Sequence, residues 1–326
     1  MGLTRRGAMI GVGGALVLAG PLARAQAAYP SRNIRMIVPY PPGGTTDLLG
    51  RLIAEKIRTE LNAIVVVENK PGAGTTLGAE LVARSEPDGY TLLMATSTTL
   101  AINKTLYKKL PYDPLKDFAP VSLVAGVPFA LIINRNIPAK TLAEFIAYAK
   151  ANPGLAYGSA GNGSPQHLGA EMLKTAANID IRHVPYRGSV PAMLDVIAGH
   201  IPLMIVDLQP ALQQIKEGKV RVLGVTTPKR VTAAPEIPTI AEAGLPGYEL
   251  VAWQGVVAPA GTPRLIVDAL AEQIAKLLSE PASRERFVSM AIEPLPGSTP
   301  DSFAAYIKTE VDRWADIVRK SGAEAE

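Results

Sequence analysis

The chemistry that this sequence suggests most directly is anion binding, at a loop rich in glycine and proline. The loop runs from Pro39 to Asp47, between a short apolar run and a segment whose apolar residues recur every four positions, as on one helix face. The first N–H groups of a helix lack intrahelical partners and lie at the positive end of its dipole, so a carboxylate or phosphate is favoured there. Gly43 and Gly44 also allow the backbone to approach a ligand closely. We therefore predict an anion site at this helix start.

Three further turns rich in glycine or hydroxyl residues follow predicted strands. They span residues 69–76, 158–165 and 185–189. Each alone is ordinary turn chemistry. Their recurrence in both halves of the chain favours a function, because open α/β sheets bind ligands outside the carboxyl ends of their strands. Two such domains facing each other would line one cleft.

Four side chains beside these turns each allow two interpretations. Asp47, the first acid of a predicted helix, could satisfy backbone donors or accept an ammonium or hydroxyl group of the ligand. His167 could line the cleft or bond to the backbone in the first turn of its helix. Asp207 ends a strand, as a ligand-binding carboxylate or as a turn-forming residue. Whether Arg187 contacts the ligand is equally open.

Other kinds of site fit the sequence poorly. A G-x-G-x-x-x-G run begins at Gly72, but four residues separate it from the preceding strand and no acidic residue ends the next strand, so a dinucleotide fingerprint is not matched. The turn at 158–161 has Tyr157 where a serine-hydrolase elbow needs glycine. The three histidines have no partner at metal-ligand spacing, and the chain has no cysteine. We therefore expect no catalytic residues, no metal and no cofactor.

The elements that must position these turns alternate along the chain. Predicted helices cover residues 46–61, 75–84, 141–151, 165–177 and 190–198, with strand-like runs between them. This alternation is typical of an α/β fold with a mainly parallel sheet. The apolar runs at 118–134 and 250–258 could each carry the chain from one domain to another. Thr262 and Thr299, each followed by proline, predict the capped starts of two further helices.

The N-terminus has the pattern of a secretory signal peptide. Arg5 and Arg6 precede an uncharged run that ends in small residues near Ala25 and Ala27, so residues 1–27 are predicted to be removed. The run is short and glycine-rich for a membrane anchor, which needs roughly 20 mainly apolar residues. The arginine pair resembles a twin-arginine signal, although Ala8 stands where a large apolar residue is usual. The mature chain is expected in the periplasm.

Charge and composition narrow the possible partners. Removing the leader also removes three arginines and no acid, so the formal net charge falls from +4 to +1. No basic run with interleaved aromatic residues is present, which argues against nucleic acid. A mature chain of this length can form two domains with separate cores, and without cysteine their stability must come from packing.

Taken together, these segments resemble the Bug family, the extracytoplasmic solute receptors of tripartite tricarboxylate transporters. The resemblance extends from about Tyr29 to the C-terminus. Its most specific parts are residues 41–47, 67–74, 87–93, 110–114, 157–161, 183–188 and 258–263.

The resemblance implies a monomeric, two-lobed periplasmic binding protein of type II, an α/β Venus flytrap. Such a protein would close around a small carboxylate without catalysis and deliver it to the membrane subunits of a transporter. Residues 28–125 plus 251–326 would form one lobe and 126–250 the other, with hinge-crossing strands near 124–129 and 250–255. The ligand could be a dicarboxylate, a tricarboxylate, an aromatic acid or an acidic amino acid. A receptor that feeds a membrane sensor is the alternative.

The same resemblance implies how the carboxylate is held. Backbone N–H groups, hydroxyls and ordered waters would come from loops 41–47, 72–74 and 159–164, without a buried cation. Thr45 stands where many relatives have glycine or serine, which implies a narrower pocket floor. The candidate ligand-binding residues are Tyr40, Pro42, Gly43, Gly44, Thr45, Thr46, Asp47, Gly72, Ala73, Gly74, Ser159, Ala160, Gly161, Gly163, Ser164, His167 and Asp207.

Overall fold

The computed structural model describes residues 2, 29–321 and 323, so nearly all of the predicted signal peptide lies outside the described residues. The strands are β1 (Ile34–Val38), β2 (Val65–Asn69), β3 (Thr91–Thr96), β4 (Phe118–Asn134), β5 (Leu155–Ser159), β6 (Ile181–Pro185), β7 (Leu203–Asp207), β8 (Val220–Val225), β9 (Val251–Pro259) and β10 (Glu293–Pro294). The α-helices are α1 (Thr45–Leu61), α2 (Thr76–Ala83), α3 (Asn103–Leu106), α4 (Leu142–Ala151), α5 (Pro165–Ala177), α6 (Ser189–Ala198), α7 (Leu208–Lys216), α8 (Arg264–Ser279), α9 (Pro281–Ser289) and α10 (Pro300–Ser321).

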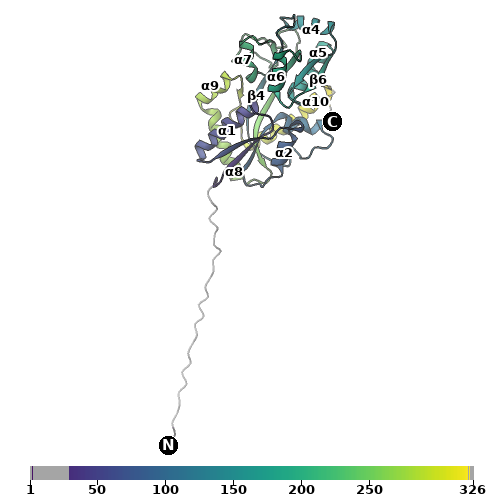
Figure 1. The fold of residues 1–326 in the computed structure, drawn as a ribbon. Coiled ribbons are helices and arrows are strands. Elements are labelled where there is room, and N and C mark those ends of the chain that lie inside the picture. Colours follow the sequence, from purple (N-terminus) through teal and green to yellow (C-terminus); the bar gives the residue numbers. More distant parts are fainter. Residues whose placement is uncertain (1, 3–28, 322, 324–326) are drawn as a thin grey trace.

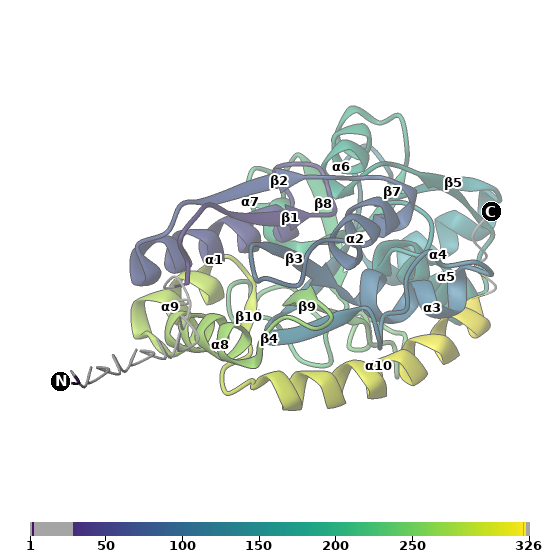
Figure 2. The ribbon, with the colours of Figure 1, turned by 90° about the horizontal axis from the view of Figure 1, so that it is seen from below.

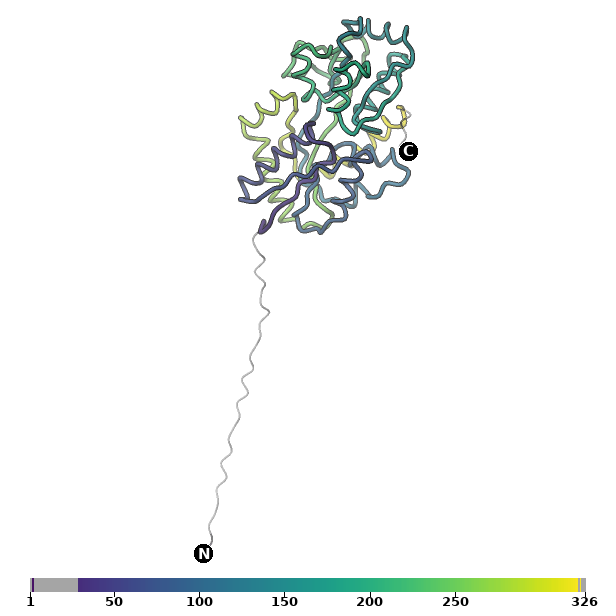
Figure 3. Tube along the Cα trace, in the orientation of Figure 1, coloured from purple at the N-terminus to yellow at the C-terminus, as the bar shows by residue number. Residues whose placement is uncertain are grey.

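The fold has two lobes joined by long strands (Figure 1). The sheet order is β2-β1-β3-β9-β4-β7-β5-β6, with β8 and β10 also paired to β4. Strand β4 passes from one lobe to the other, because it pairs with β9 as far as Pro128 and with β7 from Phe129 onward. The tube in Figure 3 shows the middle of the chain in one lobe and both chain ends mainly in the other. The predicted two-lobed α/β fold is confirmed, while the lobe boundaries remain a prediction.

The sheet is mixed, so the prediction of a mainly parallel sheet is wrong. Strand β1 pairs in parallel with β2 and β3, and β5 does so with β6 and β7. Strands β4 and β9, however, run antiparallel to every strand they pair with. Parallel pairing needs a crossover helix, and these two strands connect the lobes instead of continuing a strand–helix series.

Each face of the sheet carries its own hydrophobic core. Successive side chains of a strand point to opposite faces, and in β3 Leu92 and Met94 join one buried cluster while Leu93 and Ala95 join another. Helix α1 covers the first of these clusters with the apolar face predicted from its periodicity, including Ile53. Covering both faces explains why β3 is buried along its whole length.

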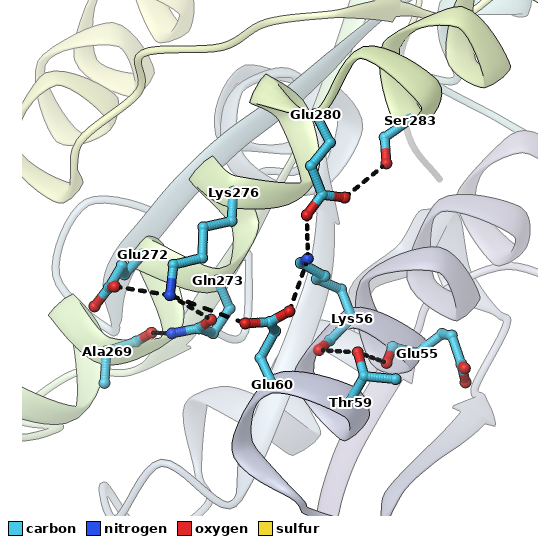
Figure 4. A network of polar contacts seen from close by, with 10 residues as sticks. All are labelled: Glu55, Lys56, Thr59, Glu60, Ala269, Glu272, Gln273, Lys276, Glu280 and Ser283. Carbon is cyan, nitrogen blue, oxygen red and sulfur yellow. Dashed lines mark hydrogen bonds and ion pairs between the residues drawn. The ribbon is translucent and has the colours of Figure 1, made fainter.

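A network of charged side chains fixes the C-terminal half of α1 against α8 and α9 (Figure 4). Lys56 Nζ donates to Glu60 Oε1 at 2.9 Å and also to Glu280. Lys276 of α8 pairs with Glu60 at 3.9 Å and with Glu272 of its own helix at 2.9 Å. A network of this kind positions a helix better than an isolated surface pair, and it holds α1 with its N-terminus directed away from these contacts.

Helix α10 extends along one side of the molecule and contacts α8, β4, α3 and α5 (Figure 2). Its buried Glu310 Oε2 accepts hydrogen bonds from Trp253 Nε1 at 2.7 Å and Trp314 Nε1 at 2.9 Å. Because Trp253 lies on β9, this carboxylate ties the helix to one of the two crossing strands. A buried carboxylate with several donors is stable only while those donors are present.

Of the two helix caps predicted from the sequence, one is present in the structure and the other is not. Ser302 N–H donates to Thr299 Oγ1 at 3.1 Å and α10 begins at Pro300, so that predicted cap is confirmed. The cap predicted at Thr262 is wrong, because its hydroxyl donates to Pro259 O at 2.8 Å and α8 begins only at Arg264. Helices α7 and α9 and the helical segment 98–106 are additional to the predicted elements. Within the described residues, no helix combines the length and apolar character needed to cross a membrane.

Candidate ligand-binding cleft

A cavity lies between the lobes, where β4 and β9 cross. Its lining comes from segments 40–42, 44–46, 96–98, 165–166, 188–191 and 252–254, together with Val127, Phe129 and Asp207. Both lobes therefore contribute to one site. The cavity measures about 40 Å³, whereas one buried water needs about 10–15 Å³, so the two walls lie close together.

Four helices begin at this cavity. Thr45 lies in the first turn of α1, Gln166 in that of α5 and Ser189 in that of α6, while Asp207 is the N-cap residue of α7. Each of these helices follows the carboxyl end of a strand, namely β1, β5, β6 and β7, which explains their convergence. Four positive dipole ends directed at one space favour an anion.

Three of these helix starts keep backbone donors available. No side chain caps α1, α6 or α7 among the described residues, whereas Ser164 Oγ caps α5 by accepting from His167 N–H at 3.3 Å. The first N–H groups of an α-helix have no intrahelical acceptor. A ligand carboxylate can therefore accept from the backbone, as the loop sequence predicted, without a cationic side chain.

Asp207 is the acidic group of the cavity wall. Its carboxylate accepts hydrogen bonds from Gln166 Nε2 at 2.6 Å, Ser189 Oγ at 3.1 Å and Thr45 Oγ1 at 3.3 Å. Burial raises the pKa of Asp207 to about 6, although these three bonds work in the opposite direction. The carboxylate thus lies inside the cleft, and its only polar partners among the described residues are uncharged.

The cavity lining also contains buried polar atoms that have no hydrogen-bond partner among the described residues. Gln166 Oε1 and Gln254 Oε1 are buried and have no hydrogen-bond partner within the described part of the chain, and the same holds for Ser97 Oγ. All three side chains line the cavity. Buried polar atoms are nearly always hydrogen-bonded in folded proteins, so these atoms indicate where a bound molecule would make polar contacts.

Asp47 is engaged away from the cavity lining. Its carboxylate accepts from Asn69 Nδ2 at 2.9 Å, from Arg51 Nε and Nη2 at 3.0 Å and from Gly43 N–H at 3.1 Å. Burial acts to raise the pKa of Asp47, but the hydrogen bonds from Arg51, Asn69 and Gly43 lower it overall. Of its two predicted roles, the geometry favours the one that satisfies local donors. Gly43 is likewise outside the lining, and its N–H is used by Asp47.

His167 lies behind the cavity wall, stacked on a second histidine. The rings of His167 and His183 are 3.9 Å apart and nearly parallel, at 7°. His167 Nδ1 accepts from Gly163 N–H at 3.2 Å, and Ser159 Oγ lies 2.6 Å from His183 Nε2. Burial lowers the pKa of both imidazoles, and the neighbouring ring contributes to lowering that of His183 to about 3. The stack supports the glycine-rich turn from behind.

The predicted ligand-binding loops 72–74 and 159–164 also lie outside the cavity lining. Ala73 and Gly74 are in left-handed conformations, and Asn103 Nδ2 holds the turn by donating to Gly74 O at 2.9 Å. The predicted residues in the lining are Tyr40, Pro42, Gly44, Thr45, Thr46 and Asp207, and those outside it are Gly43, Asp47, Gly72, Ala73, Gly74, Ser159, Ala160, Gly161, Gly163, Ser164 and His167. Arg187 is also outside the lining.

The sequence interpretation missed several polar residues of the lining. Gln166 follows Pro165 in the first turn of a predicted helix, and Ser189 ends the third predicted turn, so the helix-start rule could have identified both. Ser97 and Gln254 give no such signal. Gln254 lies within the crossing strand β9, where it donates from Nε2 to Thr46 Oγ1 at 2.9 Å, and only the strand pairing brings it to the cleft.

Several known proteins are similar to this chain in sequence and in structure. Protein BugT of Bordetella pertussis is 37% identical over 326 residues, covering 99% of this chain and 99% of the relative. A structure of an R. palustris protein with adipate shares 36% identity at a TM-score of 0.88, covering 91% of this chain and 99% of that one. MatC from Rhodopseudomonas palustris, with bound malate, shares 33% identity at a TM-score of 0.84, covering 89% and 100%.

The family assignment rests on most of the chain. The sequence model of one protein family, described as the tripartite tricarboxylate transporter family receptor, matches residues 49–323. That span contains both crossing strands and the starts of α5, α6 and α7 at the cavity. The start of α1 lies just before it. The chain therefore belongs to the tripartite tricarboxylate transporter receptors, a family of solute-binding proteins, and its resemblance to the Bug family is confirmed.

Proposed function

We propose that this protein captures a small carboxylate in the cleft between its lobes and delivers it to the membrane subunits of a transporter. The observation that carries the proposal is the convergence of α1, α5, α6 and α7 on one cavity, with no side-chain cap on three of them. Similar proteins are known with adipate and with malate bound. Neutral backbone donors suit a receptor that releases its ligand, because no buried cation is left unpaired when the cleft opens.

Capture proceeds by closure of the lobes around β4 and β9. Residues 28–125 plus 251–326 move as one lobe and 126–250 as the other, after export to the periplasm and removal of residues 1–27. Binding and release involve no covalent step, so the protein is not an enzyme. The ligand adds contacts to both lobes at once, which shifts the population toward the closed form. The closed form is the one that the membrane subunits recognise.

Ligand titration of the mature protein tests the proposal. The protein is unfolded, dialysed and refolded to remove co-purified molecules, then titrated calorimetrically with mono-, di- and tricarboxylates and acidic amino acids. At least one acid should bind with a 1:1 stoichiometry. A lack of response to every acid, from protein whose circular dichroism shows refolding, would contradict the proposal.

A variant at the start of α1 locates the binding. Gly44 has φ −86°, which any residue adopts, and a Cβ built there meets no atom within 4 Å. The substitution Gly44→Leu should therefore fold normally while its side chain fills the cleft, and binding should fall at least tenfold. Ala282→Leu, on the exposed surface of α9, is the matched control and should bind as the wild type does.

A further inference from the structure

The two walls of the cleft differ in hydrogen-bonding character. On the α1 side, the N–H groups of Thr45 and Thr46 belong to the uncapped first turn of the helix and are donors. On the side of α5 and β7, Asp207 and Gln166 Oε1 are acceptors. A plain carboxylate satisfies only the donor wall, because a carboxylate has no hydrogen to give to the other wall.

The orientation of the Gln166 amide follows from its partners. Its Nε2 donates to Asp207 Oδ1 at 2.6 Å and to Ser189 Oγ at 3.0 Å. An ionised carboxylate only accepts hydrogen bonds, so the nitrogen of the amide must face Asp207. Gln166 Oε1 is then the free end of the amide, and this side chain is only 4% exposed. Both lone pairs of that oxygen lack a donor among the described residues.

Asp207 has no cationic partner among the described residues. Its carboxylate receives hydrogen bonds only from uncharged groups, namely the side chains of Gln166, Ser189 and Thr45 and its own backbone N–H. No ion pair within the described residues includes this carboxylate, and the nearby Tyr40 phenol is uncharged at neutral pH because burial raises its pKa to about 12. A buried carboxylate without a cation is costly. A cationic group on the ligand would provide this carboxylate with the opposite charge that it lacks.

We propose that the ligand is an α-amino acid, whose ammonium group binds Asp207 and Gln166 Oε1 while its α-carboxylate binds the first turn of α1. This inference rests on the proposed function and narrows its ligand class. Thr45 connects the two subsites, because its N–H belongs to the donor wall and its hydroxyl contacts Asp207 at 3.3 Å. Two subsites this close match an ammonium and a carboxylate carried by one carbon atom, and they disfavour the two distant ends of an ω-amino acid.

Calorimetry with matched ligands tests the inference. The probes are L-aspartate with succinate and L-malate, L-glutamate with glutarate, and 4-aminobutyrate with butyrate, each titrated into refolded wild-type protein. We expect at least one α-amino acid to bind tenfold or more tightly than its analogue without the amine. In Asp207→Asn this preference, taken as the ratio of the two dissociation constants measured on the same variant, should fall below about threefold. Gln166→Met is an independent second variant. It removes the other acceptor and should reduce the preference in the same direction.

The outcomes separate this inference from the proposed function. Plain diacids that bind as tightly as their amino analogues, or hydroxy acids that bind more tightly, would overturn the amine subsite and leave carboxylate capture intact. An amine preference that persists in both variants would also overturn the assignment to Asp207 and Gln166. If no acid of either kind binds the refolded wild-type protein, the proposed function fails and the inference fails with it.

Discussion

Thr45 Oγ1 donates a hydrogen bond to Asp207 Oδ2 across the cleft at 3.3 Å, although the two residues are 162 positions apart in the chain. Thr45 begins α1 on one wall and Asp207 is the N-cap residue of α7 on the other, and both side chains are buried. The bond can exist only while the two walls are together. It therefore links ligand binding, lobe closure and the ionisation of Asp207 at one point.

Replacing Thr45 by valine should weaken ligand binding. Valine keeps the shape of threonine but removes the hydroxyl, so the closed form loses a hydrogen bond to a charged group, which contributes about 1.5–3 kcal/mol. We expect the dissociation constant of the tightest-binding acid to rise roughly tenfold or more, as 1.4 kcal/mol corresponds to a factor of ten. Isothermal titration calorimetry measures this change.

Thr59→Val is the control for that experiment. Thr59 lies on the exposed side of the same helix, where its hydroxyl donates to the backbone carbonyls of Glu55 and Lys56. The control should bind with wild-type affinity. Equal affinities for Thr45→Val and the wild type would show that the contact across the cleft contributes nothing to closure.

Asp207→Asn should change how stability depends on pH. The pKa of this carboxyl is about 6 in the folded protein and 3.8 in a model compound, so the folded state binds its proton more tightly than the unfolded state. The wild type therefore loses stability as the pH rises through that window, by up to about 3 kcal/mol. Asparagine does not titrate, so the variant should gain relative to the wild type between pH 4 and 7. Urea unfolding at both pH values measures the difference, and a difference that does not vary with pH would contradict the burial of an ionising Asp207.

Asp47→Ala should lower stability more than ligand selectivity. The substitution leaves Gly43 N–H, Asn69 and Arg51 without their acceptor, which corresponds to a loss of about 1.5–3 kcal/mol in the free energy of unfolding. Binding of amino acids and of plain acids should weaken by the same factor, since Asp47 is outside the cavity lining. Urea unfolding and calorimetry measure the two effects. A loss confined to amine-bearing ligands, with unchanged stability, would restore Asp47 as a ligand contact.

The histidine stack should make the protein sensitive to acid. The folded-state pKa of His183 is about 3, and that of His167 is also lowered from 6.5. Because the unfolded state binds protons first, the stability contributed by the neutral rings is complete above pH 6.5 and is lost as the pH falls toward 3. Replacing His183 by phenylalanine keeps an aromatic ring and removes one titration. The variant should recover about 2–3 kcal/mol relative to the wild type between pH 7 and pH 4.

His200→Gln provides the comparison for the histidine stack. This third histidine is exposed, and its one ion-pair partner within residues 29–321 is Asp195, at 3.2 Å. Its replacement removes an imidazole from the surface and leaves the stack intact, and the pH dependence of the melting temperature is measured for both variants. If His183→Phe and His200→Gln alter that dependence equally, burial of the stack is not the cause.

Most of the fold could be predicted from the alternation of apolar periods. The spacing of Leu49, Ile53 and Ile57 identified α1 because all three are buried on one face, and the apolar length of β4 indicated a crossing strand. Strand direction could not be predicted, because β3 pairs with β9, more than 150 residues later in the chain. Helix α7 was missed because it begins directly after β7, at Leu208, without a turn between them.

The site could be predicted only in part, for a related reason. Thr45 and Asp207 were identified because each stands where a strand gives way to a turn or helix. Whether a side chain there faces the cleft or its own loop depends on partners distant in sequence. For Asp47 and His167 the sequence allowed either orientation. Asn69 holds Asp47 away from the lining, and His183 does the same for His167. Gln254 reaches the cleft through strand pairing alone.

A crystal structure of the mature protein, with the acid that binds most tightly in calorimetry, would show directly whether the cleft binds a carboxylate. We expect a ligand carboxylate between the lobes, within hydrogen-bond distance of the N–H groups of Thr45 or Thr46 at the start of α1. If the acid carries an α-amine, that nitrogen should lie near Asp207 and Gln166 Oε1. A ligand bound outside this cleft, or one whose carboxylate contacts none of the four helix starts, would contradict the account.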